Sequence, residues 1–191
     1  MTDGAALAAA FNRPGAIARD GVGNLYVVDQ NGRAIRKITP SGIVSTLVAS
    51  SNSAFAKLRG LAADTDGTLY AADQDNHVIH KIAPDGNITT AAGPGTAGTS
   101  DGPASSAKLN TPTDVALDPS GNLYFTESGS HLVRRLAKNG TVSTVAGAGN
   151  KGFADGQGAF ARFSSPQHLV VGPDGRVYVS DHANWRIRII E

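Results

Sequence analysis

The segment that decides the fold is Gly23-Asn24-Leu25-Tyr26-Val27-Val28-Asp29, which the chain repeats in three further versions. These read Gly67-Thr68-Leu69-Tyr70-Ala71-Ala72-Asp73, then Gly121-Asn122-Leu123-Tyr124-Phe125-Thr126-Glu127, and finally Gly175-Arg176-Val177-Tyr178-Val179-Ser180-Asp181. The four tyrosines are separated by 44, 54 and 54 residues. A recurring period of this size indicates a repeat architecture, and the blades of a propeller have similar lengths.

Each repeat has the pattern of short strands joined by tight turns. A turn such as Asp118-Pro119-Ser120-Gly121 precedes the tyrosine segment, with Pro fixing φ and Gly supplying a positive φ. The tyrosine segment itself is rich in β-branched and aromatic residues, as strands are. No long helical periodicity occurs. The pattern predicts further strands at 34–38, 78–82, 132–136 and 186–190, and outer ones at 43–48, 88–92 and 141–146.

The repeats predict an all-β, single-domain β-propeller of four-stranded antiparallel blades. About four blades are expected, at 11–50, 58–93, 109–147 and 163–191, after an insert-like lead over 1–10. The last blade is expected to lack its outer strand, which leaves a sheet edge open. Three arrangements remain: a piece of a longer propeller, a half-propeller that pairs with a second copy through its open edges, and a small closed four-bladed monomer.

Composition excludes several classes of protein. The 191 residues contain 17 Lys and Arg against 16 Asp and Glu, a net charge of +1, so a strongly basic nucleic-acid binder is not indicated. There is no cysteine, which rules out disulfides and thiolate metal sites but says nothing of the compartment. Neither a signal peptide nor a membrane-spanning run is evident, and a secreted parent protein remains open.

The repeat resembles the NHL family, whose pattern is Gly, a short apolar strand, Tyr-Val-x-Asp and then Asn-x-Arg-Ile-x-x-Ile. The fourth unit is most similar, with Tyr178-Val179-Ser180-Asp181 followed by Asn184-Trp185-Arg186-Ile187-Arg188-Ile189. The third unit departs, with Glu127 for Asp, Ser130 for Asn and Leu132 for Arg. The resemblance implies a propeller, usually of about six blades. It implies no particular function, because such propellers host both binding and catalysis.

Two columns of equivalent residues are interpreted as structural. The tyrosines Tyr26, Tyr70, Tyr124 and Tyr178 are expected in equivalent, largely buried places between blades. One acid per blade follows at the end of the same strand: Asp29, Asp73, Glu127 and Asp181. A ring of carboxylates around a cation is the functional alternative. The regular spacing instead favours a local hydrogen bond from each acid to loop amides or, in the fourth blade, an ion pair with Arg186.

Candidate ligand-binding residues lie in the loop after each acid: Arg33, His77, His131, His182 and Trp185. Two histidines make at most a partial zinc site, so a hydrogen-bonding or solvent-facing role is favoured over a metal site. His80 and His168 stand apart from this column. The third strands also carry basic residues in alternation, which predicts solvated positions: Arg36, Lys37, Lys81, Arg134, Arg135 and Arg188. An RNA surface is not favoured, because no aromatic residues are interleaved with them for base stacking.

No catalytic residue, metal or cofactor is predicted. Four near-equivalent units without a unique constellation favour a noncatalytic scaffold that binds a protein, a peptide or a glycan. The alternatives are a fragment of a metal-dependent, lactonase-like hydrolase or lyase, an RNA-binding surface, and an inactive fragment of a propeller. The third unit, with Glu127, Ser130 and His131, is the one asymmetry that an enzyme could use.

Overall fold

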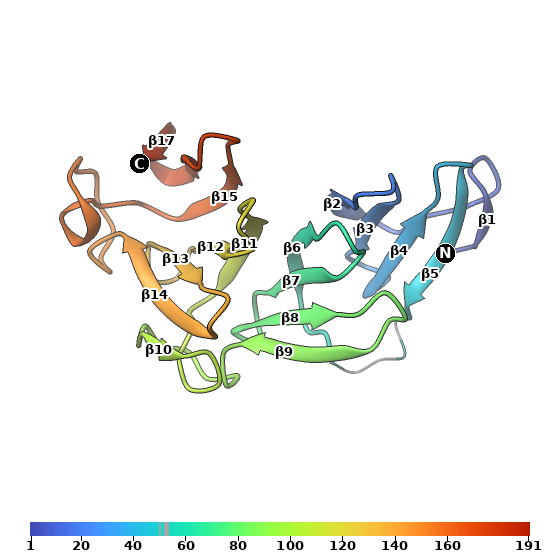
Figure 1. Ribbon diagram of the computed structural model, residues 1–191, viewed down its shortest axis with the longest axis horizontal. Helices are drawn as coiled ribbons and strands as arrows, with labels where there is room; N and C mark the ends of the chain where they lie inside the picture. The colour runs from blue at the N-terminus through green and yellow to red at the C-terminus, as the bar shows by residue number, and fades with distance from the viewer. Residues whose placement is uncertain (50, 52–53) are drawn as a thin grey trace.

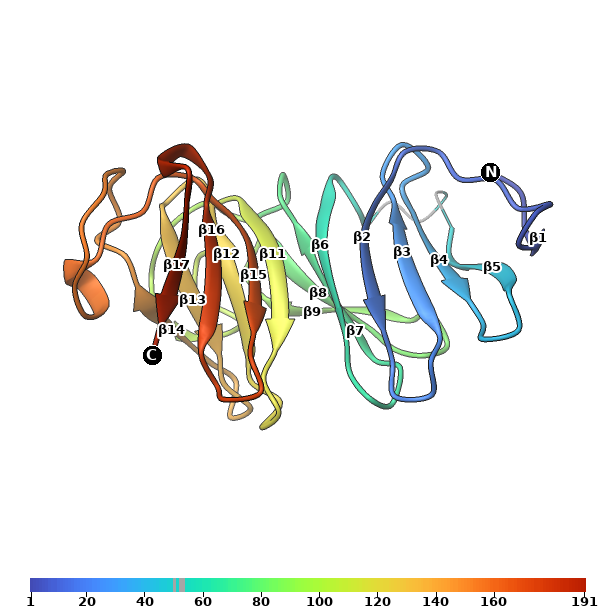
Figure 2. The same cartoon turned by 90° about the horizontal axis from the view of Figure 1, so that it is seen from above.

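The computed structural model describes residues 1–49, 51 and 54–191, and shows four antiparallel sheets arranged as an open arc (Figure 1). Each sheet is one blade, and the first strand of every blade faces the inside of the arc. Seen from above, these strands run side by side, with loops at both of their ends (Figure 2). The chain is therefore an all-β propeller that is not closed between its first and last blades.

The strands follow the repeat. Blade 1 contains β2 (Pro14–Arg19), β3 (Leu25–Asp29), β4 (Ala34–Ile38) and β5 (Ile43–Val48). Blade 2 contains β6 (Leu58–Ala63), β7 (Leu69–Asp73), β8 (Val78–Ile82) and β9 (Ile88–Ala92). Blade 3 contains β11 (Pro112–Leu117), β12 (Leu123–Glu127), β13 (Leu132–Leu136) and β14 (Thr141–Ala146). Blade 4 has three strands, β15 (Pro166–Val171), β16 (Val177–Asp181) and β17 (Arg186–Ile190).

Two blades have a fifth strand that the repeat did not predict. The short strands β1 (Gly4–Ala5) and β10 (Gly102–Pro103) pair with the outer strands β5 and β14 of the blades that follow them. They come from the lead and from an insert, whose Asp-Gly turns bring the backbone alongside the outer edge. The helical elements of the described chain are two 3-10 turns, η1 (Gly158–Phe160) and η2 (His182–Asn184). The described residues contain no helical segment with the length and hydropathy of a membrane span.

The hydrophobic core consists of three clusters, one at each junction between consecutive blades. At the first junction Ile35 and Val48 of blade 1 pack with Leu61, Leu69 and Ile82 of blade 2. The other two junctions repeat this arrangement. A four-stranded blade cannot cover both of its faces alone, so the neighbouring blade must cover one of them.

The four tyrosines occupy equivalent places but are not equally buried. Each pairs with the inner strand of its own blade, and Tyr26 is 1% exposed whereas Tyr70, Tyr124 and Tyr178 are half-buried. The Tyr26 hydroxyl donates to Asp20 at 3.0 Å and lies against the turn at Gly67 of the next blade. Burial and this hydrogen bond raise the pKa of Tyr26 to about 12. Tyr26 alone is fully buried, whereas Tyr70 and Tyr124 are partly buried against the clusters at the next two junctions.

Candidate functional site in the axial cleft

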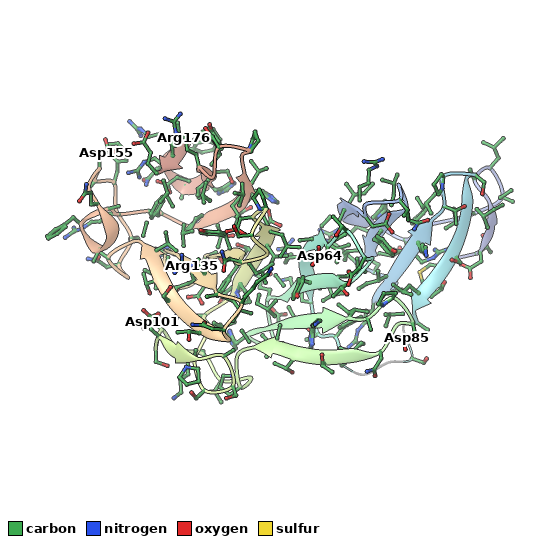
Figure 3. The ribbon with its side chains drawn as sticks, in the orientation of Figure 1. Asp64, Asp85, Asp101, Arg135, Asp155 and Arg176 are labelled. Carbon is green, nitrogen blue, oxygen red and sulfur yellow. The ribbon has the colours of Figure 1, made fainter. Side chains whose placement is uncertain are left out.

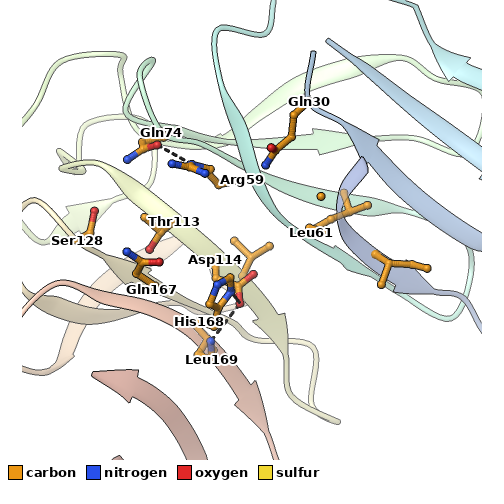
Figure 4. Close-up of a pocket in the computed structure, with 14 residues that line it drawn as sticks. Gln30, Arg59, Leu61, Gln74, Thr113, Asp114, Ser128, Gln167, His168 and Leu169 are labelled. Carbon is orange, nitrogen blue, oxygen red and sulfur yellow. Dashed lines mark hydrogen bonds and ion pairs between the residues drawn. The ribbon is translucent and has the colours of Figure 1, made fainter. Parts of the chain in front are cut away.

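A cleft of about 440 Å³ lies where the inner strands of all four blades converge (Figure 4). Its volume is within the range of small-molecule sites. The polar residues that line it come from different blades, and apart from the equivalent glutamines Gln30 and Gln74 they differ from one repeat to the next. They are Gln30, Arg59, Gln74, Thr113, Asp114, Ser128, Gln167 and His168.

A bulge near the start of each inner strand directs these side chains towards the axis. The pairing of β11 with β12 shifts register between Pro112 and Asp114, and that of β15 with β16 shifts between Pro166 and His168. The blades approach closely here, since a Cβ on Gly60 would lie 2.4 Å from the Cα of Asp114. A β-bulge re-aims side chains in this way at many functional sites. Position 60 therefore requires glycine for reasons of space.

Arg59 is the one arginine on the lining of the cleft. Its Nε donates to Oε1 of Gln74 at 2.8 Å, which fixes the plane of the guanidinium (Figure 4). Its Nη groups have no acceptor among the described residues. A guanidinium held through Nε presents the remaining N–H groups as a fork that suits a carboxylate or a phosphate.

Asp114 and His168 form the second polar group of the cleft. Nδ1 of His168 lies 3.4 Å from Oδ2 of Asp114, which also accepts the backbone N–H of Leu169 at 3.1 Å. The side chain of His168 is 75% exposed and that of Asp114 only 15%. Hydrogen bonding to Asp114 and its negative charge raise the pKa of His168. Because Nδ1 faces Asp114, Nε2 is the nitrogen left for a ligand.

The four acids of the repeat are buried and form local hydrogen bonds and ion pairs. Asn12 donates its backbone N–H to Asp29 at 2.8 Å, and Ser164 donates to Asp181 at 2.7 Å. Each acid also meets a basic side chain of the third strand of its own blade. In the fourth blade this residue is Arg188, 3.2 Å from Asp181, so the expected partner Arg186 is wrong. Arg186, two positions earlier on the same face of the strand, instead donates to the carbonyl of Asn184 at 3.0 Å and lies over the ring of Phe153.

Glu127, the acid of the third blade, has a raised pKa. Glu127 accepts from the hydroxyl of Ser130 at 2.5 Å and from Arg134 at 3.1 Å. Burial raises the pKa of Glu127 to about 7, although Arg134 and Ser130 oppose that shift. In the second blade, burial disfavours ionisation of Asp73, but hydrogen bonds from His80 and from two backbone amides outweigh it and lower the pKa. Glu127 lies inside its blade and is not on the lining of the cleft, so it does not supply the asymmetry of an active site there.

The candidate ligand-binding residues in the loops after the acids connect one blade to the next. Arg33, His77, His131 and Trp185 all adopt left-handed backbone, with φ between 48° and 59°. Nδ1 of His77 accepts the N–H of Thr111 at 3.1 Å, and Nδ1 of His131 accepts that of Ser165 at 3.1 Å. Burial lowers the pKa of His131, with Lys151 contributing, which favours the neutral ring that this hydrogen bond needs. These histidines join blades and do not converge on one another.

The other members of the column fit the same pattern. Arg33 donates through Nη2 to the carbonyl of Phe55 in the next blade. Trp185 is 88% exposed, and the ring of His182 lies against it with centroids 6.0 Å apart. Neither Trp185 nor His182 lines the axial cleft. In the described residues no group of three His, Cys, Asp or Glu side chains is placed to hold a metal ion.

The expectation that the basic residues of the third strands are solvated is wrong for three of them. Arg36 and Arg134 are fully buried, and Arg188 has the equivalent orientation. Each reaches an acid of the preceding insert: Asp3, Asp101 and Asp155, at 2.7, 2.7 and 2.6 Å. The inserts bring these acids over the blade, a contact that strand alternation alone does not reveal.

Sequence reasoning missed the cleft residues. In the sequence His168 stands apart from the other histidines, and no motif includes Arg59, Asp114 or the glutamines. A signal was present, because the two residues after Pro14, Leu58, Pro112 and Pro166 differ in every repeat. Variable positions at the inner end of a repeated strand are where unlike side chains meet at the axis.

Comparison with known proteins gives short sequence matches. No model of a protein family matches the chain. It is 35% identical over 95 residues to Protein SUPPRESSOR OF QUENCHING 1, chloroplastic, of Arabidopsis thaliana, which covers 49% of this chain and 9% of that protein. It is also 35% identical over 81 residues to NHL repeat-containing protein 2 of Gallus gallus, covering 42% of this chain and 11% of that protein. The chain thus spans a small part of the length of these relatives.

The similar solved structures are longer propellers. A Bacteroides thetaiotaomicron protein of unknown function has a TM-score of 0.82 at 25% identity, over 93% of this chain and 47% of that one. An auxiliary nutrient binding protein of the same organism has a TM-score of 0.76 at 20% identity, over 92% and 48%. A gluconolactonase of Xanthomonas campestris has a TM-score of 0.71 at 20% identity, over 94% and 58%. The chain spans about half the length of these structures.

The fold and these comparisons define a repeat β-propeller. The sequence similarity to an NHL repeat-containing protein and the propeller fold of the similar structures agree with the NHL-like pattern of the four units. Proteins with this fold include a binding protein and enzymes, so the fold does not select between them.

Proposed function

We propose that the chain is a noncatalytic binding module whose axial cleft holds a small anionic ligand with several hydroxyl groups, such as a sugar acid. The observation that carries the proposal is the convergence of unlike polar residues from three blades: Arg59, Asp114 and His168. Convergent polar groups in one concave pocket are the usual mark of a ligand site.

The chemistry of the lining favours this ligand class. Arg59 offers a fork of N–H donors, and His168, with its raised pKa, adds a second cation. Both suit a carboxylate. The amides of Gln30, Gln74 and Gln167 both donate and accept, as recognition of hydroxyl groups requires. Asp114 limits the net charge of the cleft and accepts hydrogen bonds only.

Calorimetric titration with gluconate, glucuronate and galacturonate tests the proposal, with glucose and acetate as comparison ligands. We expect at least one sugar acid to bind more tightly than either comparison ligand. R59A should weaken that binding by about tenfold or more, the value of a hydrogen bond to a charged group. R176A is the matched control, since Arg176 lies outside the cleft. Equal affinity of the R59A variant and the unchanged protein would contradict the proposal.

A second candidate function is acid–base catalysis of the lyase or lactonase kind. It is supported by the Asp114–His168 pair, because a carboxylate on Nδ1 orients the imidazole and increases its basicity. Assays with lactones and esters, repeated on H168A, test it. Turnover that disappears in H168A would support an enzyme. Turnover that is equal in H168A would exclude His168 as the base.

A further inference from the structure

The bulge of β15 places Gln167 and His168 on the lining of the axial cleft. The pairing of β15 with β16 passes from Pro166 opposite Asp181 directly to His168 opposite Ser180, so Gln167 is the extra residue and has no partner on β16. A bulge of this kind leaves main-chain groups without their ladder hydrogen bonds, and such groups need other partners. The backbone that carries His168 must therefore be held from outside its own sheet.

Two threonines of blade 3 supply these partners. Thr113 of β11 is 8% exposed and Thr126 of β12 is fully buried, and their hydroxyl oxygens lie 2.9 Å apart. The Thr113 hydroxyl lies 3.2 Å from the carbonyl oxygen of Pro166, and the Thr126 hydroxyl lies 3.2 Å from that of Gln167. Each hydroxyl has one proton to donate, and both face carbonyls of β15. The pair therefore bonds blade 3 to the backbone just before His168.

The backbone after the bulge is bonded as well. Asp114 accepts the backbone N–H of Leu169 at 3.1 Å, and the hydroxyl of Ser180 accepts that of His168 at 2.9 Å. Blade 3 thus holds β15 on both sides of His168, whose side chain is 75% exposed. Because so little of this ring is packed, its orientation towards Asp114 depends on the backbone that carries it.

The threonine pair is peculiar to the third blade. At the position of Thr126, blade 1 has Val28 and blade 2 has Ala72, and neither residue has a hydroxyl. The junctions that follow blades 1 and 2 form without one, so the fold itself does not require a hydroxyl at this place. The pair occurs instead at the junction where His168 meets Asp114.

We propose that Thr113 and Thr126 are positioning residues of the axial cleft. They fix the bulge of β15 so that Nδ1 of His168 faces Asp114, as Figure 4 shows. This role rests on the proposed function, since it concerns the same cleft. Without the Thr126 hydroxyl, the carbonyl of Gln167 loses its donor, and an unpaired carbonyl favours a shift of the bulge. Such a shift moves His168 away from Asp114 and changes no charge of the cleft.

The ring of His168 reports this geometry without any ligand. The hydrogen bond to Asp114 and the charge of that residue raise the pKa of His168, while partial desolvation and the charge of Arg59 oppose the shift. A threonine hydroxyl is neutral, so its removal should change this pKa through the distance between the ring and Asp114. In T126V we expect the pKa of His168, measured by NMR titration of the unliganded whole chain, to fall towards the ordinary 6.5. T126S keeps the hydroxyl and should retain the raised pKa.

Three further variants calibrate the titration. D114N removes the acid itself and should lower the pKa of His168 at least as far as T126V does. D85N removes an acid from the turn between β8 and β9, at the outer side of blade 2 (Figure 3), and should leave that pKa unchanged. T89V is the matched control for the loss of a threonine hydroxyl, because the Thr89 hydroxyl lies 3.4 Å from the carbonyl oxygen of Lys81, outside the cleft.

The affinity for the tightest sugar acid should fall by about three- to tenfold in T126V, the net value of one hydrogen bond, and should be unchanged in T89V. Thermal unfolding checks that each variant folds, and T113V, which removes the other hydroxyl, takes the place of T126V in the titration if T126V does not fold. An unchanged pKa of His168 in the folded variant overturns the positioning role. An equal fall in T126S also overturns it, because packing would then be the cause. Absence of sugar-acid binding to the unchanged chain contradicts the proposed function alone, since the NMR titration needs no ligand.

Discussion

His168 lies 3.4 Å from Asp114, although the two residues belong to different repeats and different blades. They meet because the bulges of β11 and β15 place equivalent positions side by side at the axis. Equivalent positions carry Ala16 in the first repeat and Gly60 in the second. The chain thus has near-symmetric blades and an asymmetric axial surface.

Binding of an anionic ligand in the cleft should depend on pH through His168. Asp114 raises the pKa of His168 above its ordinary 6.5, so the ring carries a positive charge at and somewhat above that pH. Affinity should be full at lower pH and should decline as the pH rises through the raised pKa. Titration of gluconate across this window, with H168Q as the comparison, measures the effect. A decline that persists unchanged in H168Q would assign it to another group.

Stability should depend on pH through Glu127. Its pKa is raised from 4.5 to about 7 by burial, so the folded state retains a proton that the unfolded state releases. Its contribution to the free energy of unfolding is therefore full below about pH 4.5 and is lost as the pH rises through about 7. E127Q should remove this loss, which urea unfolding at several pH values can measure. E191Q, at an exposed site, is the control. Parallel pH profiles for E127Q and the unchanged chain would contradict the interpretation.

The close approach of the inner strands should make Gly60 irreplaceable. A methyl group in G60A would meet the backbone of Asp114, 2.4 Å away, and should lower the free energy of unfolding by about 1–3 kcal/mol. It should also weaken ligand binding, because Asp114 must shift. A16S, at the equivalent position of the first blade, should change stability by less than about 0.5 kcal/mol. Equal stability of the two variants would show that the blades do not press together at the axis.

The unequal burial of the tyrosines should appear in mutant stabilities. Y26A removes a ring that is 1% exposed and a hydroxyl that is bonded to Asp20, so we expect a loss of about 3–5 kcal/mol. Y178A removes a half-buried ring on a face that no described blade covers, and about 1 kcal/mol is expected. Chemical denaturation of both variants gives the comparison. A larger loss for Y178A would mean that another surface covers that face.

The repeat pattern predicts the number of repeats, the order of the strands and the three strands of the last blade. Alternating apolar residues and Pro-Gly turns act over a few positions, so each copy such as 121–127 specifies its own strand. The same local logic indicated that the acids Asp29, Asp73, Glu127 and Asp181 have one common role.

Which residues of different blades meet depends on how the sheets are arranged around the axis. Arg59, Asp114 and His168 converge because four bulged strands share an axis, and Asp155 meets Arg188 because an insert folds back over its own blade. These contacts join segments far apart in the chain. They depend on the angle and spacing between whole sheets, which no pattern within a single repeat encodes.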